Sequence, residues 1–245
     1  MSQGSSFFRR ASAPLYASLF TTTLLACGLL TMSSPAQAEA HDHKGVLQPF
    51  KGAPPQVKLS AADETRLAKG KSVRKQAKSE GGGRGMVIQD IHADVKTVWS
   101  RITDYAKYPT MVDDVTECST YKGADISKDV IYARFVIGGF GFSLEYFIKH
   151  TFKPKQGYMT WTLDYDKKSE LDDSVGYWYV VKHPLKTGWT RVYYSVDVRV
   201  GSWVPGLIED MIADKGLEKA TSWVRLESEK AQKKIPPRAS TPAKP

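Results

Sequence analysis

Hydrophobic and polar residues alternate with a period of two through much of the second half of the chain. In the stretch 142–152 the apolar positions are 142, 144, 146, 148 and 152, and in the stretch 189–200 they are 192, 194, 196, 198 and 200. Such alternation is typical of antiparallel strands with one apolar and one solvated face. Together with the turn signals between the runs, it predicts six consecutive strands, at 115–121, 130–137, 142–152, 158–164, 176–181 and 189–200.

Helical patterns lie on both sides of this β-rich region. Residues 86–92 suit a short strand, apolar residues at helical spacing follow within 95–102, and a second short helix is expected around 104–112. After Pro205 the chain runs to Lys234 without another proline and keeps an apolar side, which predicts a long helix. A sheet with one apolar face needs a cover, and this helix is the element that remains. We therefore predict an α+β fold in which a curved antiparallel sheet wraps around a long C-terminal helix, with two short helices after the first strand.

The N-terminal segment has the order of residues found in export signals. Arg9 and Arg10 precede a long uncharged, apolar run, and the small residues of Ala36-Gln37-Ala38 stand before Glu39. We expect 1–38 to be a signal peptide that directs export to a periplasm, a secretory space or an organelle lumen. An uncleaved membrane anchor is the alternative, because the apolar run is nearly long enough to span a bilayer. A lipoprotein signal at Cys27 is also permitted, although apolar residues continue after it.

Composition divides the remaining chain into three parts. Residues 39–84 are rich in Pro, Gly, Lys and Ser, and we expect a basic flexible linker with one short helix that begins after Ser60. The glycine-rich stretch 81–85 is expected to act as a hinge into the folded domain. The domain itself is predicted at 85–232, and a disordered basic tail is predicted at 233–245.

The distribution of charge excludes one class of partner. The whole chain carries a formal charge of +9, but residues 86–229 contain 18 basic and 21 acidic residues and are mildly acidic. A folded nucleic-acid-binding domain carries its positive charge on the domain surface, so we expect no nucleic acid partner. The basic residues of the flanks suit peripheral contact with an anionic membrane or act as solubilising linkers; they include Lys69, Lys71, Arg74, Lys75, Lys78, Lys230, Lys233, Lys234 and Arg238.

Cysteine usage gives no covalent support to the fold. After removal of the signal peptide, Cys118 is the one cysteine left, so no internal disulfide can form. We expect Cys118 to pack as a small hydrophobic residue and the chain to be a monomer.

Several short motifs resemble one superfamily. The run IHADVKTVW at 91–99, followed by DYAKYP at 104–109, resembles the opening of the polyketide cyclase/dehydrase and coenzyme Q-binding branch of the START-like (SRPBCC, helix-grip) superfamily. The runs GYW at 176–178, GWTRVYY at 188–194 and VP at 204–205 resemble its second half. The resemblance covers most of 85–229. It implies an internal cavity between the sheet and the long helix that holds a lipid, quinone, sterol, polyketide or similar molecule.

Side-chain parity selects the residues that would face such a cavity. On the sheet and the long helix these are Tyr146, Ile148, His150, Phe152, Trp161, Trp178, Val192, Tyr194, Val196, Val198, Met211, Ile212 and Trp223. At the expected mouth of the cavity lies an apolar lip formed by Trp203, Pro205, Leu207 and Ile208. His150 interrupts an apolar face and is the one candidate for acid–base chemistry.

Three functions are compatible with this pattern. The favoured one is non-catalytic binding or transfer of a hydrophobic small molecule, the first alternative is a cyclase or dehydratase that uses His150, and the second is a module that docks on a membrane or protein. The motifs of zinc proteases, structural zinc sites and α/β-hydrolases do not occur, so we expect no metal and no cofactor. The acidic stretch 164–173 does not fit a calcium loop, and a solvated connection is expected there.

Overall fold

The computed structural model describes residues 36–37, 40, 42, 45–55, 57–79, 82–122, 129–139, 142–200 and 214–235. All of them belong to one compact unit, Pro35–Pro245. The predicted mouth residues Trp203, Pro205, Leu207 and Ile208, and the predicted lining residues Met211 and Ile212, lie outside the described residues.

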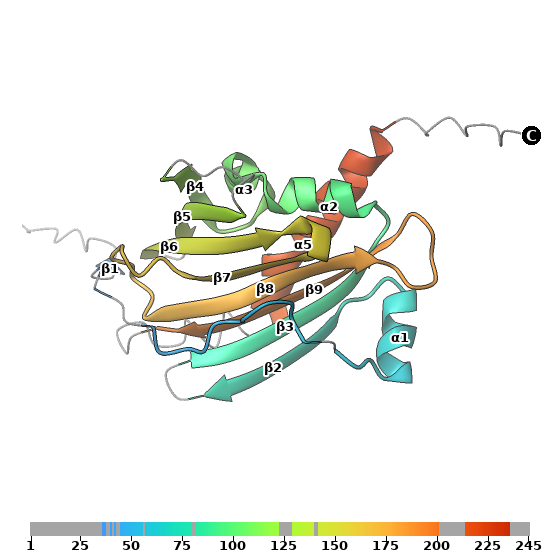
Figure 1. Ribbon diagram of the computed structural model, residues 1–245, viewed down its shortest axis with the longest axis horizontal. Helices are drawn as coiled ribbons and strands as arrows, with labels where there is room; N and C mark the ends of the chain where they lie inside the picture. Colours follow the sequence, from blue (N-terminus) through green and yellow to red (C-terminus); the bar gives the residue numbers. More distant parts are fainter. Residues whose placement is uncertain are drawn as a thin grey trace, which may run out of the picture. The chain divides into compact units, whose positions relative to one another are not determined.

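The described strands form one sheet whose main path has eight antiparallel members in the order β2-β3-β9-β8-β7-β6-β5-β4 (Figure 1). Their bounds are Val73–Ser79 (β2), Gly82–Ile91 (β3), Val115–Tyr121 (β4), Val130–Gly139 (β5), Phe142–Lys153 (β6), Tyr158–Leu163 (β7), Asp173–Lys182 (β8) and Thr190–Arg199 (β9). A two-residue strand, β1 (Ala36–Gln37), pairs in parallel with β6. The predicted six-strand meander is thus confirmed as β4 to β9, and the α+β class is confirmed with it.

Three described helices lie on one side of the sheet, which we call the inner face (Figure 1). They are α2 (Val95–Ile102), α3 (Tyr108–Met111) and α5 (Asp214–Lys233), and the short 3₁₀ helix η1 (Tyr105–Lys107) joins the first two. A second 3₁₀ helix, η3 (Pro154–Gln156), turns the chain between β6 and β7. The two short helices predicted after the first strand are therefore present, and the predicted C-terminal helix is described from Asp214 onward.

Close approach of α5 explains the glycine at position 85 of β3. A Cβ atom at Gly85 would collide with the side chain of Leu217 on α5. Glycine therefore lets α5 lie directly against β3. The glycine-rich stretch 81–85 had been predicted as a hinge, but residues 82–85 lie within β3 and pair with both β2 and β9, so that prediction is wrong.

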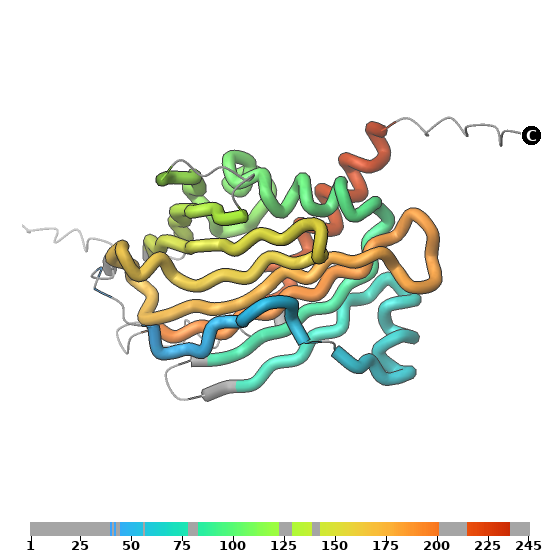
Figure 2. Tube along the Cα trace, in the orientation of Figure 1, coloured from blue at the N-terminus to red at the C-terminus, as the bar shows by residue number. Residues whose placement is uncertain are grey.

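The opposite, outer face of the sheet is covered by residues that were predicted to be a flexible linker. We call residues 45–55 and 57–59 the outer segment; Figure 2 shows this part of the chain, in blue, running in front of the sheet. The backbone N–H groups of Val46 and Leu47 donate to the Asp173 carboxylate at 2.6 and 2.7 Å. The ring of Phe50 packs edge-on against Tyr177, with 4.9 Å between centroids.

After the outer segment, the chain forms α1 (Ala61–Ala68) and then β2. The helix begins as predicted, with a capping box in which the Ser60 hydroxyl accepts from the Asp63 backbone N–H. Leu67 of α1 is buried with Val73 and Ile88 in a small second core on the outer face. The prediction that 39–84 is a linker is therefore wrong beyond its short helix, and so is the prediction of a solvated outer face, since Tyr177 and Ser195 are buried there.

The acidic connection between β7 and β8 is also packed rather than solvated. Asp164, Ser169 and Glu170 are all buried. The backbone N–H groups of Asp164 and Glu170 donate to the carbonyl oxygens of Phe147 and Glu145, at 2.8 and 2.9 Å. The connection thus continues the hydrogen bonding of β6 where β7 no longer pairs with it.

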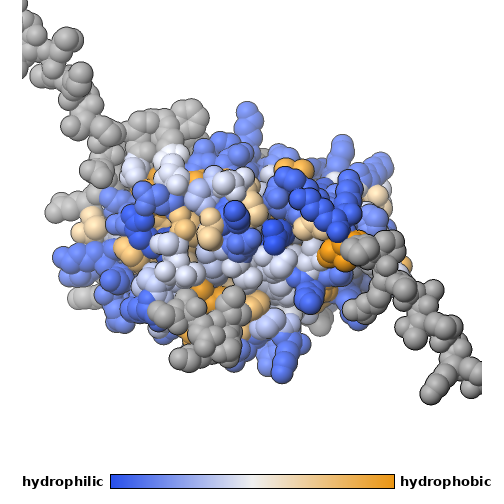
Figure 3. Space-filling view, turned by 90° about the horizontal axis from the view of Figure 1, so that it is seen from above, coloured by the Kyte–Doolittle hydropathy of each residue, from blue (hydrophilic) through white to orange (hydrophobic). Residues whose placement is uncertain are grey.

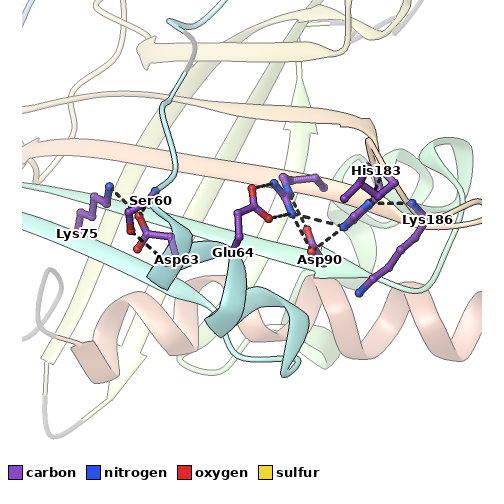
Figure 4. Close-up of polar contacts among 9 residues, drawn as sticks. Ser60, Asp63, Glu64, Lys75, Asp90, His183 and Lys186 are labelled. Carbon is purple, nitrogen blue, oxygen red and sulfur yellow. Dashed lines mark hydrogen bonds and ion pairs between the residues drawn. The ribbon is translucent and has the colours of Figure 1, made fainter.

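A buried ion network fastens α1 to the sheet (Figure 4). Arg191 of β9 contacts the Asp90 carboxylate of β3 at 2.7 Å and both carboxylate oxygens of Glu64 on α1, at 2.6 and 2.8 Å. The side chains of Arg191 and Asp90 are only 4% and 3% exposed, whereas Glu64 is 47% exposed. Burial alone would raise the pKa of Asp90, but the hydrogen bonds and charge of Arg191 outweigh it and lower that pKa.

His183 extends this network to the loop between β8 and β9. Its Nδ1 atom accepts from the backbone N–H groups of Leu185 and Lys186, each at 3.0 Å. Its Nε2 atom lies 2.9 Å from Asp90 Oδ2, so the proton belongs on Nε2, which donates to the carboxylate. One carboxylate therefore connects β3, β9 and the β8–β9 loop.

Hydrophilic residues dominate the face shown in Figure 3, where hydrophobic residues form only small, separate patches. Among the described residues, no helix combines the length and the apolar character needed to cross a membrane.

We predict that removing Arg191 destabilises the protein more than removing its contact with Glu64 alone. Arg191→Met leaves the Asp90 carboxylate buried without its main partner and should lower the free energy of unfolding by about 3–5 kcal/mol. Glu64→Gln changes a half-exposed contact and should cost less than about 1 kcal/mol. Urea unfolding of both variants measures these losses. Equal losses in the two variants would show that the Asp90–Arg191 pair is not the anchor.

Candidate functional site

The predicted lining residues that the structure describes lie together on the inner face. Ten of them belong to the main hydrophobic core or pack against it, and they come from β6, β7, β8, β9 and α5: Tyr146, Ile148, Phe152, Trp161, Trp178, Val192, Tyr194, Val196, Val198 and Trp223. The eleventh, His150, makes ring contacts with the same core. Side-chain parity therefore placed each of these residues on the correct face.

Seven of the rings in this core form a closed circuit, which we call the aromatic circuit. Each ring contacts the next, with centroid separations between 4.5 and 6.4 Å. In order, the circuit runs Tyr105, Tyr108, Trp223, Trp178, Tyr194, Trp161, His150 and back to Tyr105. Its members come from seven different elements, so the circuit forms only when these elements pack together.

Sequence reasoning missed three aromatic residues of this region. Tyr105 and Tyr108 lie in the DYAKYP run but were not assigned to the site, and Phe135 of β5 contacts both of them. The alternation of Ile131, Ala133 and Phe135, all buried, was the available signal for Phe135.

A glycine determines where Trp161 lies. Gly176 of β8 is directly opposite Trp161 of β7 in the sheet register. A Cβ atom at Gly176 would collide with the Trp161 indole and with the Ser195 carbonyl oxygen. The indole can therefore lie flat over the neighbouring strand, where its Nε1 donates to the Ser174 hydroxyl at 3.3 Å.

His150 is a neutral imidazole enclosed by aromatic rings. Its side chain is 6% exposed, and its Nδ1 atom is buried without a hydrogen-bond partner in the described part of the chain. Burial lowers its pKa to about 3, and the opposing effect of a hydrogen bond with the Ile131 backbone is smaller. A buried polar atom without a partner costs roughly 1–3 kcal/mol, so Nδ1 is available to a partner other than the described residues.

Two tyrosines that pack against the same core also have hydroxyls without a partner in the described part of the chain. Tyr146 and Tyr194 are only partly buried, in contrast to Tyr105 and Tyr108. The Tyr108 hydroxyl donates to the Ile102 carbonyl at 2.7 Å, whereas the hydroxyls of Tyr146 and Tyr194 have no hydrogen-bond partner among the described residues. Burial raises the pKa of both, so each remains a neutral donor.

No metal or thiol chemistry is visible at this site. Within the described ranges, no three His, Cys, Asp or Glu side chains are grouped to hold a metal ion. Cys118 packs against the core, and burial raises the pKa of its thiol to about 12. The thiol is therefore protonated at neutral pH.

Comparison with solved structures identifies the fold: the chain has the START-like fold. A STAR-related lipid transfer protein from Xanthomonas axonopodis superposes with a TM-score of 0.50 at 12% identity, covering 64% of this chain and 93% of that one. A START superfamily protein from Mycobacterium smegmatis (TM-score 0.48, 18% identity, 65% and 98% covered) and the Zhui aromatase/cyclase from a Streptomyces species (0.49, 10%, 65% and 94%) are also similar. No family model matches the sequence. No curated protein matches it either.

We predict that His150 makes the protein sensitive to mild acid. Because its pKa is about 3 in the folded protein and about 6.5 when unfolded, the unfolded state binds the extra proton first. The contribution of His150 to the free energy of unfolding is therefore fully present well above pH 6.5. It falls by up to about 1.4 kcal/mol per pH unit below that pH. Urea unfolding between pH 6.5 and 5, above the range in which carboxylates titrate, measures this slope.

The variant His150→Phe should remove most of the slope. His92 is exposed and stacks on Trp189, so His92→Phe is the matched control and should retain the slope. The same slope in both variants would contradict the assignment to His150.

Proposed function

We propose that this protein binds or transfers a hydrophobic small molecule that carries at least one polar group, without changing it chemically. The observation that supports this most directly is the buried, unpartnered Nδ1 atom of His150 inside the aromatic circuit. An apolar, aromatic surrounding with a few polar groups is the usual composition of a small-molecule site. The partly accessible side chains of Tyr146, Tyr194 and Val196 give such a molecule a surface to contact.

The polar groups specify what the molecule must offer. A neutral imidazole with a free Nδ1 either donates to or accepts from a ligand, depending on its tautomer. The hydroxyls of Tyr146 and Tyr194 are neutral donors. A carbonyl or hydroxyl group on a lipid, quinone, sterol or polyketide-like molecule satisfies both kinds of atom. The name of the Xanthomonas axonopodis protein, a lipid transfer protein, agrees with this class of ligand.

The electrostatics favour binding over a cyclase or dehydratase reaction. Acid–base catalysis is most efficient when the pKa of the catalytic group lies near the working pH. Burial holds the pKa of His150 at about 3, so at neutral pH the imidazole is a weak base and has no excess proton to give. The tyrosine hydroxyls are still weaker acids than usual, because burial raises their pKa values.

We predict that a hydrophobic molecule copurifies with the protein, and that its retention requires the inner-face residues Tyr194 of β9 and His150 of β6. Organic extraction followed by mass spectrometry should recover it from the whole protein and from Tyr193→Phe, because Tyr193 faces outward beside Leu67, Val73 and Ile88. Recovery should fall by roughly tenfold in Tyr194→Phe and His150→Phe, which lose a hydrogen bond to the ligand. Equal recovery from all four proteins, or none from any, would overturn the proposal.

We also propose that the chain is exported and processed after Ala38. Cleavage there would remove β1, on which the eight-stranded path does not depend. The intact mass of the protein from the producing cell should correspond to a chain that begins at Glu39. An intact N-terminus in a membrane fraction would instead support the anchor.

A further inference from the structure

A basic pocket of about 400 Å³ lies at the edge of the inner face, separate from the aromatic circuit. It is formed by the turn after α1, by β2 and β3, and by one side of α5. Four cationic side chains, Arg66, Lys71, Arg74 and Arg225, line it together with the single carboxylate of Glu218. The pocket thus has a net charge of +3.

Arg225 has donors that no described residue uses. Its Nη1 atom donates to the Gly70 carbonyl oxygen at 2.6 Å, which fixes the side chain against the turn. Its Nε and Nη2 atoms are buried and have no partner within the described residues. An unpartnered, buried guanidinium edge is costly and matches the spacing of two oxygen atoms of one oxyanion.

Other side chains that line the pocket supply further hydrogen-bond donors. Arg66 is held by its Nε atom, which donates to the Ser72 carbonyl at 2.7 Å. Lys71 and Ser222 are exposed at the rim of the pocket. The hydroxyl of Ser222 and the ammonium group of Lys71 are therefore further donors that line the same pocket as Arg225. Glu218 is occupied by Arg74, at 3.0 Å, which reduces its repulsion of an anion.

We propose that this pocket binds a phosphate-bearing ligand. A tetrahedral phosphate accepts hydrogen bonds from several directions, whereas a carboxylate accepts mainly in one plane, and the donors that line this pocket belong to α1, the turn after it, β2 and α5. The volume exceeds that of inorganic phosphate, so the group would be part of a larger molecule. Trp223 belongs to the aromatic circuit while Ser222 and Arg225 line the pocket, so α5 separates this site from the one proposed above.

The test compares ligands at constant ionic strength, because screening alone changes surface electrostatics. Thermal unfolding of the whole protein is followed in inorganic phosphate, glycerol phosphate and chloride. Both phosphates should raise the unfolding midpoint relative to chloride. Arg225 also holds Gly70, so the variant is made at the rim instead: Lys71→Glu with Ser222→Asp should raise the apparent Kd for glycerol phosphate by roughly tenfold or more.

The matched control places the same pair of changes on α2, as Lys96→Glu with Ser100→Asp, where both residues are also exposed. It should bind phosphate like the parent protein. Flotation with phosphatidylcholine vesicles containing phosphatidylglycerol distinguishes the source of the phosphate. Vesicle binding that glycerol phosphate competes away and the rim variant loses identifies a lipid headgroup. Phosphate binding without such vesicle binding identifies a soluble phosphate ester. Equal midpoints in phosphate and chloride, or equal Kd values in the rim variant and the control, overturn the proposal.

Discussion

The ion pair between Asp90 and Arg191 is the constraint on which the rest of the structure depends. Both groups are buried, so neither can lose the other without leaving a charge in a poorly solvated environment. Because Glu64 and His183 complete the same network, it joins α1, the neighbouring strands β3 and β9 and the β8–β9 loop. The position of α1 then sets the course of β2 and of the turn that forms one wall of the basic pocket.

The two faces of the sheet differ in the kinds of side chain that they bury. The inner face brings together aromatic rings from seven elements and leaves His150 as an isolated neutral group among them. The outer face buries charged and polar groups too; Asp90, Arg191 and Asp173 pair within networks there, whereas the Tyr177 hydroxyl is buried without a partner among the described residues. His150 differs in that its unpaired Nδ1 atom lies among the rings of the aromatic circuit, which is why it carries more functional information than the better-connected Asp90 or Asp173.

The sequence predicted those features that depend on local pattern. Alternation in β6 and β9 identified the inner face correctly, and the Ser60 cap identified the start of α1. The outer segment could not be predicted in this way, because its residues are held by distant partners such as Asp173 rather than by their own periodicity. Arg191 lies on the side of the strand that was predicted to be solvated. Its burial could not be predicted, because its partners Asp90 and Glu64 are distant in the sequence. Phe135 was missed although its strand alternates, because parity was not applied to the strand predicted at 130–137.

The strand β2 has a consequence for self-association. It is the last strand on one side of the sheet, and it carries Arg74 and Lys75, whose charges are held by Glu218 and Asp63. Charged residues on an edge strand discourage other chains from adding to the sheet. A chain shortened to begin at Gly85 would lose β2 and the outer segment together. The shortened β3 would then be the edge, with few charges to oppose pairing with a second copy, so the residues before the recognisable domain also keep the protein from aggregating.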